Sequence, residues 1–406
     1  MLNQELFLDL AEARWVVDRW GFEYHHRRPH RTFDYQIPVA FAACWFALVG
    51  ATPSLQQASS HMHPGSLTKT GTNSGARSEF MQWIPLIITV TCDPQIQDPR
   101  NPRTKELFSV DGIAKEYQDA NLAGAVIDHV HGIYSRDPVV QADGKQLQIP
   151  NIEETAAIIQ QIRAAHPRIT IQQGLASMRP EQKLALWEKI EPEMSSLNLN
   201  SHDEYFDPYP TEVKPRCCYS VHPINELRQY FQWSKQYDVK PELECFDSGA
   251  FDAVRIIREG IFWTDDDRME EEKGLLDDPL WCTFFFGWPG QSCQPMTDLA
   301  LFNQVYHKPA QLNWSMSCMS RCPKEYWAQI NRGVLKNGHI RVGYEDCGKH
   351  PDGAYASCNA DLVDRVVQMA KLVGRPIATV EEAREIIGLR AAIREDNHET
   401  GAGIST

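Results

Sequence analysis

The sequence predicts an α/β protein, a (β/α)8 or TIM barrel preceded by a mostly disordered N-terminal extension. Two observations support this fold class. From Trp83 onward, apolar runs of strand length alternate with amphipathic stretches of helical length, a pattern typical of parallel sheets with helical crossovers. The side chains best suited to chemistry also fall at the carboxyl ends of these runs, where barrel enzymes carry their active sites.

Eight apolar runs are predicted as strands, and six amphipathic stretches between them are predicted as helices. The predicted strands are Leu86–Thr91, Ala125–His131, Ile169–Gln173, Glu193–Asn198, Pro241–Phe246, Trp281–Phe286, Leu312–Met316 and His339–Tyr344. The predicted helices are Val110–Asn121, Ile152–Ala165, Pro180–Ile190, Ile224–Gln236, Ala250–Glu259 and Lys324–Val334.

The residues before the first strand have a different character. A helical stretch leads into Tyr24-His-His-Arg-Arg-Pro-His-Arg31, and Ser54–Ala76 is rich in Ser, Thr, Gly, Gln and His, as in a disordered linker. The first of these segments resembles the C-terminal tail of the integrase-type core of insertion-sequence transposases. In that family the catalytic carboxylates lie upstream of this tail, so transposition is not expected here. We therefore predict a transposase-tail-like fragment (1–45), a disordered linker (46–80), the barrel (81–390) and a flexible C-terminal tail (391–406).

Composition narrows the functional classes. A chain of 406 residues with 42% hydrophobic content can bury a full core, and a net charge of -14 argues against nucleic-acid binding, which needs a basic face. The N-terminus lacks the layout of a signal peptide, and the apolar stretch Ile37–Ala51 is shorter than the roughly 20 residues that span a bilayer. We therefore expect a cytoplasmic enzyme without membrane or nucleic-acid partners.

Two separate stretches offer the ligands of a metal site. His129-Val-His131 ends a predicted strand, and alternate residues of a strand project from one face. Another strand, His339-Ile-Arg-Val-Gly-Tyr-Glu-Asp346, places Arg341 and Glu345 on one face. A lone His-x-His motif is more often a packed or surface pair, but two histidines with a carboxylate suit zinc with an open position.

Several further motifs match one family over the region from Pro85 to Leu389. They are Pro85-Leu-Ile-Ile-Thr-Val, Pro192-Glu-Met-Ser-Ser-Leu-Asn198, Pro241-Glu-Leu-Glu-Cys-Phe-Asp-Ser-Gly249, Phe286-Gly-Trp-Pro-Gly290, Ser357-Cys-Asn-Ala-Asp-Leu-Val and the tail that starts at Val373-Gly-Arg-Pro. Together with the two metal-ligand stretches, these motifs resemble the β-keto acid cleavage enzymes. Each motif alone is weak, whereas their order and spacing are specific.

The resemblance implies a zinc-dependent barrel that condenses a β-keto acid with acetyl-CoA to give acetoacetate and a new acyl-CoA. It implies one role for each of eight residues and favours a homo-oligomer. His129, His131 and Glu345 would hold Zn²⁺, Asp346 would be the general base with Arg341 beside it, Glu244 would belong to the polar set around the reacting atoms, and Ser196 and Asn198 would bind the substrate. Glu242 shares a strand face with Glu244 and is the structural alternative to it.

The chain departs from the family pattern at two positions that bear on the substrate. Family members that act on an aminated keto acid have an acidic residue after the first strand, where this chain has Ile96. A small hydroxyl on the third strand assists the substrate carboxylate in the family, whereas this chain has Gly174. We therefore predict a keto acid without a distal amine.

Two other functions remain open from the sequence. A zinc-dependent amide or ester hydrolase on the same barrel would also begin with His-x-His on a strand. A nonenzymatic nucleic-acid-binding fusion would depend on the basic cluster His25–Arg31, which reads more simply as a surface loop.

Overall fold

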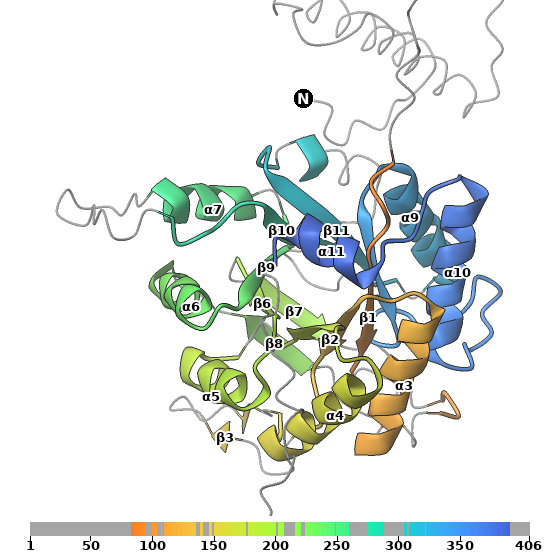
Figure 1. Cartoon of the computed structure of the whole chain (residues 1–406), viewed down its shortest axis with the longest axis horizontal. Helices are drawn as coiled ribbons and strands as arrows, with labels where there is room; N and C mark the ends of the chain where they lie inside the picture. Colours follow the sequence, from red (N-terminus) through yellow and green to blue (C-terminus); the bar gives the residue numbers. More distant parts are fainter. Residues whose placement is uncertain are drawn as a thin grey trace, which may run out of the picture. The chain divides into compact units, whose positions relative to one another are not determined.

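Eight parallel strands close into a barrel in a computed structural model of the chain (Figure 1). The strand order around the barrel is β1-β12-β11-β10-β9-β6-β5-β2, so neighbours in space are mostly neighbours along the chain. The structure describes residues 83–389 except 94–99, 104–106, 108, 135–138, 141–145, 148–149, 176–177, 200–201, 207–215, 221–223, 248, 260–273, 288–303, 307 and 321. The predicted barrel is confirmed.

Each predicted strand corresponds to a strand of the barrel. These are β1 (Ile88–Cys92), β2 (Ile127–Val130), β5 (Thr170–Gln173), β6 (Met194–Asn198), β9 (Lys240–Cys245), β10 (Leu280–Phe286), β11 (Leu312–Cys318) and β12 (His339–Gly343). The six predicted helices are present as α3 (Val110–Ala123), α4 (Ile152–Ala165), α5 (Pro180–Ile190), α6 (Ile224–Gln236), α7 (Ala250–Glu259) and α9 (Pro323–Leu335).

The structure adds elements that the sequence did not predict. Two of them are helices, α10 (Asn359–Leu372) and α11 (Val380–Ile387). The others are two antiparallel hairpins inserted between barrel elements, β3–β4 and β7–β8. Their strands are β3 (Val139–Val140), β4 (Gln146–Leu147), β7 (His202–Phe206) and β8 (Arg216–Ser220).

Side-chain caps fix where several helices begin. Ser109 accepts a hydrogen bond from the backbone of Gly112 at the start of α3, and Asn151 caps α4 in the same way. Thr379 and Glu382 form a reciprocal capping box at the start of α11. Each cap satisfies amide groups that a helix leaves unpaired at its N-terminus.

Helix α11 closes the end of the barrel at which the strands begin. Ala378, Ala383 and Ile387 pack with barrel residues in one buried cluster, and in Figure 1 α11 crosses in front of the strands. The side chain of Asn313 donates a 2.7 Å hydrogen bond to the carbonyl of Ile386 and so attaches the helix to β11. The barrel residues of this cluster are Ile87, Val126, Ile127, Met194 and Trp281. This end is therefore filled with apolar side chains, and the polar chemistry lies at the other end.

A buried arginine joins three backbone segments near this closed end. Arg375 is 2% exposed, and its guanidinium donates hydrogen bonds to the carbonyls of Ile84 (2.9 Å), Val334 (2.9 Å) and Gly338 (2.7 Å). Burial lowers the pKa of Arg375 to about 10, so the charge is retained at neutral pH. Arg375 therefore connects the end of α9 and the approach to β12 with the segment before β1.

Replacing Arg375 should destabilise the barrel. Arg375→Met removes three charge-assisted donors and leaves buried carbonyls unpaired, so we expect the free energy of unfolding to fall by about 2–4 kcal/mol in a denaturant titration. Arg168→Met is the matched control, because Arg168 forms an exposed ion pair with Glu381. The control should change stability by less than about 0.5 kcal/mol. Equal effects of the two substitutions would contradict this role.

Some predictions concern residues outside the described ranges. The transposase-tail-like fragment, the linker and the C-terminal tail lie there, as does Ile96, and they stay predictions. Within the described residues, no helix combines the length and the apolar character that crossing a membrane requires.

Candidate metal centre

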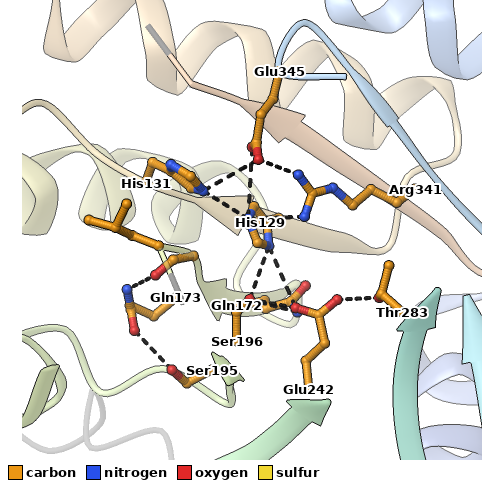
Figure 2. Close-up of polar contacts among 12 residues, drawn as sticks. His129, His131, Gln172, Gln173, Ser195, Ser196, Glu242, Thr283, Arg341 and Glu345 are labelled. Carbon is orange, nitrogen blue, oxygen red and sulfur yellow. Dashed lines mark hydrogen bonds and ion pairs between the residues drawn. The ribbon is translucent and has the colours of Figure 1, made fainter. Parts of the chain in front are cut away.

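Strand β2 directs two imidazoles to the same side. His129 lies between Thr91 of β1 and Gln172 of β5 in the strand register, and His131 directly follows the strand. Both histidines are buried, at 1% and 6% exposure. Their Nε2 atoms face one another at 3.0 Å (Figure 2). The alternation of side chains along β2 thus produces the adjacent pair that the sequence predicted.

Glu345 completes a set of three ligand atoms. It lies in the turn after β12, and its carboxylate oxygens are 3.5 Å from Nε2 of His131 and 3.8 Å from Nε2 of His129. The three ligand atoms all lie within 4.8 Å of one another. Oε2 of Glu345 is buried and has no hydrogen-bond partner, which is costly for a carboxylate unless a cation meets it. This donor set fits a metal ion.

Nδ1 of His131, the ring nitrogen that faces away from Glu345, lies next to two polar side chains. It lies 2.6 Å from Oδ2 of Asp93 and 2.9 Å from the hydroxyl of Tyr134, which itself donates to Asp93 at 2.8 Å. Burial lowers the pKa of His131, but Glu345 and Asp93 outweigh burial and raise it to about 9. A metal ion at Nε2 would have to displace that proton.

Nδ1 of His129 faces Ser196 and Glu242. It lies 3.5 Å from the hydroxyl of Ser196 and 3.9 Å from Oε2 of Glu242, and that carboxylate accepts hydrogen bonds from Ser196 and Thr283 (Figure 2). Burial, followed by the charge of Arg341, holds the pKa of His129 well below its usual value. His129 is therefore neutral, which is the form that binds metals.

Arg341 connects the ligand set to Asp346. Its guanidinium donates to Glu345, donates to Asp346 at 3.1 Å and 3.3 Å, and lies 5.1 Å from the centre of the Phe285 ring. Burial raises the pKa of Asp346 to about 7 even though Arg341 opposes the shift. Arg341 lowers the pKa of this carboxyl, but the cost of desolvation exceeds the attraction of the cation, so Asp346 is a stronger base than an exposed aspartate.

Gly174 leaves space that both histidines use. It follows β5, and a Cβ built on it would lie 2.7 Å from Nε2 of His129 and closer still to Cδ2 of His131. A side chain cannot occupy that position unless the imidazoles move. The absence of the expected hydroxyl at Gly174 therefore has a steric reason.

The structure brings together five of the eight predicted site residues. His129, His131, Glu345, Arg341 and Asp346 form one buried cluster, and Ser196 lies beside it on the Nδ1 side of His129. Asn198 and Glu244 are buried register partners in β6 and β9, and their predicted roles are not tested by this geometry.

Sequence reasoning missed three residues in contact with the cluster. Asp93 and Tyr134 were not singled out, and Glu242 was considered only as an alternative to Glu244. Asp93 could have been found from the sequence, because it lies two residues after the predicted strand Leu86–Thr91, at the end of the barrel that carries the chemistry. Tyr134 had none, since it lies in the connection after β2.

Comparison with known proteins assigns the chain to a family. The family model described as "beta-keto acid cleavage enzyme" matches residues 85–389, which is the whole barrel. The chain belongs to this family. It is accordingly an enzyme that transfers an acyl group by carbon–carbon bond cleavage, and the resemblance found in the sequence is confirmed.

Individual proteins of known activity are similar to most of this chain. The 3-keto-5-aminohexanoate cleavage enzymes of Acetoanaerobium sticklandii and Fusobacterium nucleatum are 28% and 29% identical to this chain, over 75% of it and 98% of their own length. The 3-oxoadipate:acetyl-CoA acetyltransferase of Cupriavidus necator is 25% identical over 75% of this chain and 95% of its own. A solved apo structure of ObcA has a TM-score of 0.50 at 15% identity, covering 70% of this chain and 65% of ObcA, and it supports the fold alone.

Adding a side chain at Gly174 should disturb the ligand set. Gly174→Ala places a methyl group against both imidazoles, so we expect metal bound per chain, measured by inductively coupled plasma mass spectrometry, to fall at least tenfold.

Gly374→Ala is the control for a general loss of stability. Gly374 has a φ of +72° and open space around its Cβ position, so its substitution strains the backbone away from the histidines. It should lower stability by about 1 kcal/mol without loss of metal. Full metal content in Gly174→Ala would show that the site tolerates a side chain there.

Proposed function

We propose that this enzyme cleaves a β-keto acid in a zinc-dependent reaction with acetyl-CoA and releases acetoacetate and an acyl-CoA. The observation that carries the proposal is the buried His129, His131 and Glu345 set with the Arg341–Asp346 pair beside it. Acetyl-CoA as the second substrate is supported by the activity for which the Cupriavidus necator relative is named, that of a 3-oxoadipate:acetyl-CoA acetyltransferase.

The ligand set suits zinc. Two imidazoles and one carboxylate are a common catalytic zinc set that leaves a coordination position for substrate. When bound, the metal supplies Lewis-acid polarisation of the keto oxygen, which makes the neighbouring C2 proton removable. His129 and His131 would hold it through Nε2, because their Nδ1 atoms face Glu242 and Asp93.

The residues beside the ligands supply the proton transfer. Asp346 would take the proton from C2, and a carboxylate whose pKa lies near 7 is well matched to a general base at neutral pH. Arg341 holds this carboxylate at two positions and so fixes the direction from which it approaches the substrate. Both side chains are at least 95% buried, which keeps water from the carbanion.

The bond changes then balance as an exchange of acyl groups. C2 of the keto acid attacks the thioester carbon of acetyl-CoA and expels the CoA thiolate. The thiolate attacks the original keto carbon, whose bond to C2 breaks, and the electron pair left on C2 takes the proton back. The products are acetoacetate and the acyl-CoA of the original chain. Asp346 would remove the proton and return it.

Substrate contacts are proposed from the strands around this centre. Ser196 would bind the substrate carboxylate, which requires its hydroxyl to leave Glu242. Asn198 and Glu244 would contribute polar groups from β6 and β9. Asp93 is the acidic residue that directly follows β1, and its carboxylate is engaged by His131 and Tyr134, so it does not favour an ammonium group. We propose that the substrate is a keto acid without a distal amine. We also propose that the enzyme is cytoplasmic and forms a homo-oligomer.

Two substitutions should separate metal binding from proton transfer. His129→Ala should abolish both bound zinc and acetyl-CoA-dependent acetoacetate formation. Asp346→Asn should keep zinc and lower kcat by about 10²–10⁴-fold. Wild-type enzyme that binds zinc but forms no acetoacetate from any keto acid would favour an amide or ester hydrolase.

A substrate panel should identify the acyl group. We expect 3-oxohexanoate or 3-oxoadipate to have a higher kcat/KM than 3-keto-5-aminohexanoate, because Ile96 stands where relatives with an aminated substrate have an acidic residue and Asp93 is already engaged by His131 and Tyr134. The measurement is acyl-CoA formation followed by chromatography at equal substrate concentrations. Faster turnover of the aminated acid would refute this part of the proposal.

A further inference from the structure

Asp93 and Tyr134 enclose the outer nitrogen of one proposed metal ligand. Asp93 is 1% exposed, and its Oδ2 lies 2.6 Å from Nδ1 of His131. The Tyr134 hydroxyl lies 2.8 Å from the same oxygen and 2.9 Å from Nδ1. Carboxylate, phenol and imidazole therefore form a closed triangle on the side of His131 that faces away from Glu345.

The backbone fixes two sides of this triangle. Cys92 of β1 is paired with Val130 of β2, so Asp93 and His131 follow paired residues and emerge side by side. Tyr134 is held by a bridge to Pro150, just before α4. Gly132 has a φ of +80° and packs against Thr155 of α4, which leaves the connecting turn little freedom. Strand pairing therefore positions Asp93 and His131, and the contacts before and within α4 position the turn that carries Tyr134.

The two histidines are held unequally. Nδ1 of His129 lies 3.5 Å from the Ser196 hydroxyl and 3.9 Å from Oε2 of Glu242, and the side chain of Gln172 also hydrogen-bonds His129. Nδ1 of His131 instead has a carboxylate oxygen at 2.6 Å and a phenol hydroxyl at 2.9 Å. A carboxylate that accepts the Nδ1–H of a histidine leaves its Nε2 lone pair for a metal, fixes the ring and strengthens the ligand. His131 has this arrangement at hydrogen-bond distance.

We infer that Asp93 and Tyr134 are positioning residues that hold His131 as the anchored ligand of the metal, with Asp93 orienting the ring and Tyr134 orienting Asp93. This inference rests on the proposed function, because it requires the His129, His131 and Glu345 set to bind a metal. It also predicts an order of effects: loss of the Asp93 charge weakens metal binding more than loss of the Tyr134 hydroxyl.

The test is the zinc affinity of the full chain, measured by competition with a chromophoric chelator after metal removal. Asp93→Asn should weaken affinity by about 10–100-fold, and Tyr134→Phe should weaken it less. Asp128→Asn is the matched control, because Asp128 precedes His129 on β2, is 0% exposed and projects to the opposite face, where its Oδ2 accepts a 3.1 Å hydrogen bond from Asn121 of α3. Asparagine keeps an oxygen that can accept this bond, so the zinc affinity of this variant should stay within about twofold of the wild type.

A spectroscopic measurement separates positioning from general stability. The visible absorption of the cobalt(II)-loaded protein should shift in Asp93→Asn and stay unchanged in Asp128→Asn, because the shift reports the ligand field at the metal. Wild-type affinity and spectrum in Asp93→Asn would overturn the inference and leave the proposed function intact. Equal losses in both Asp→Asn variants would also overturn it. A wild-type chain that binds neither metal would remove the proposed function and this inference together.

Discussion

The proximity of two buried imidazole nitrogens is the constraint on which the rest of the site depends. Nε2 of His129 and Nε2 of His131 lie 3.0 Å apart, and lone pairs at that distance repel unless a proton or a cation lies between them. The surrounding groups are arranged around this pair. Gly174 leaves space beside the two rings. Asp93 contacts Nδ1 of His131, and Glu345 lies on the Nε2 side of the same ring.

The charges around the two histidines also favour a cation bound between them. Four buried carboxylates contact the histidines or lie next to them, and Arg341 is bonded to two of these, Glu345 and Asp346. Unbalanced buried charge is costly, so a divalent cation at Glu345 would stabilise the set as well as serve the reaction. These charges suit a bound cation, and burial, opposed by Arg341, raises the pKa of Asp346 to about 7.

The features that could be predicted from the sequence are those that a local pattern of apolar and polar residues reveals. The eight strands were found because their apolar runs are short and bounded, and the histidine pair was found because side chains alternate along β2. Helix α11 was missed because its packing depends on barrel residues far away in sequence, such as Ile87 and Trp281. Glu242 and Glu244 share one face by period two, and only the contacts of Glu242 with Ser196 and Thr283 distinguish them.

In the proposed enzyme, His129, His131 and Glu345 supply the protein ligands of a zinc ion. X-ray absorption at the zinc edge of the metal-loaded chain tests it most directly, because the chain also contains 11 cysteines that bind zinc well. We expect a shell of nitrogen and oxygen atoms at about 2.0–2.1 Å from the zinc, with the multiple scattering of imidazole rings. A sulfur atom in the shell at about 2.3 Å, or a spectrum without imidazole scattering, would contradict it.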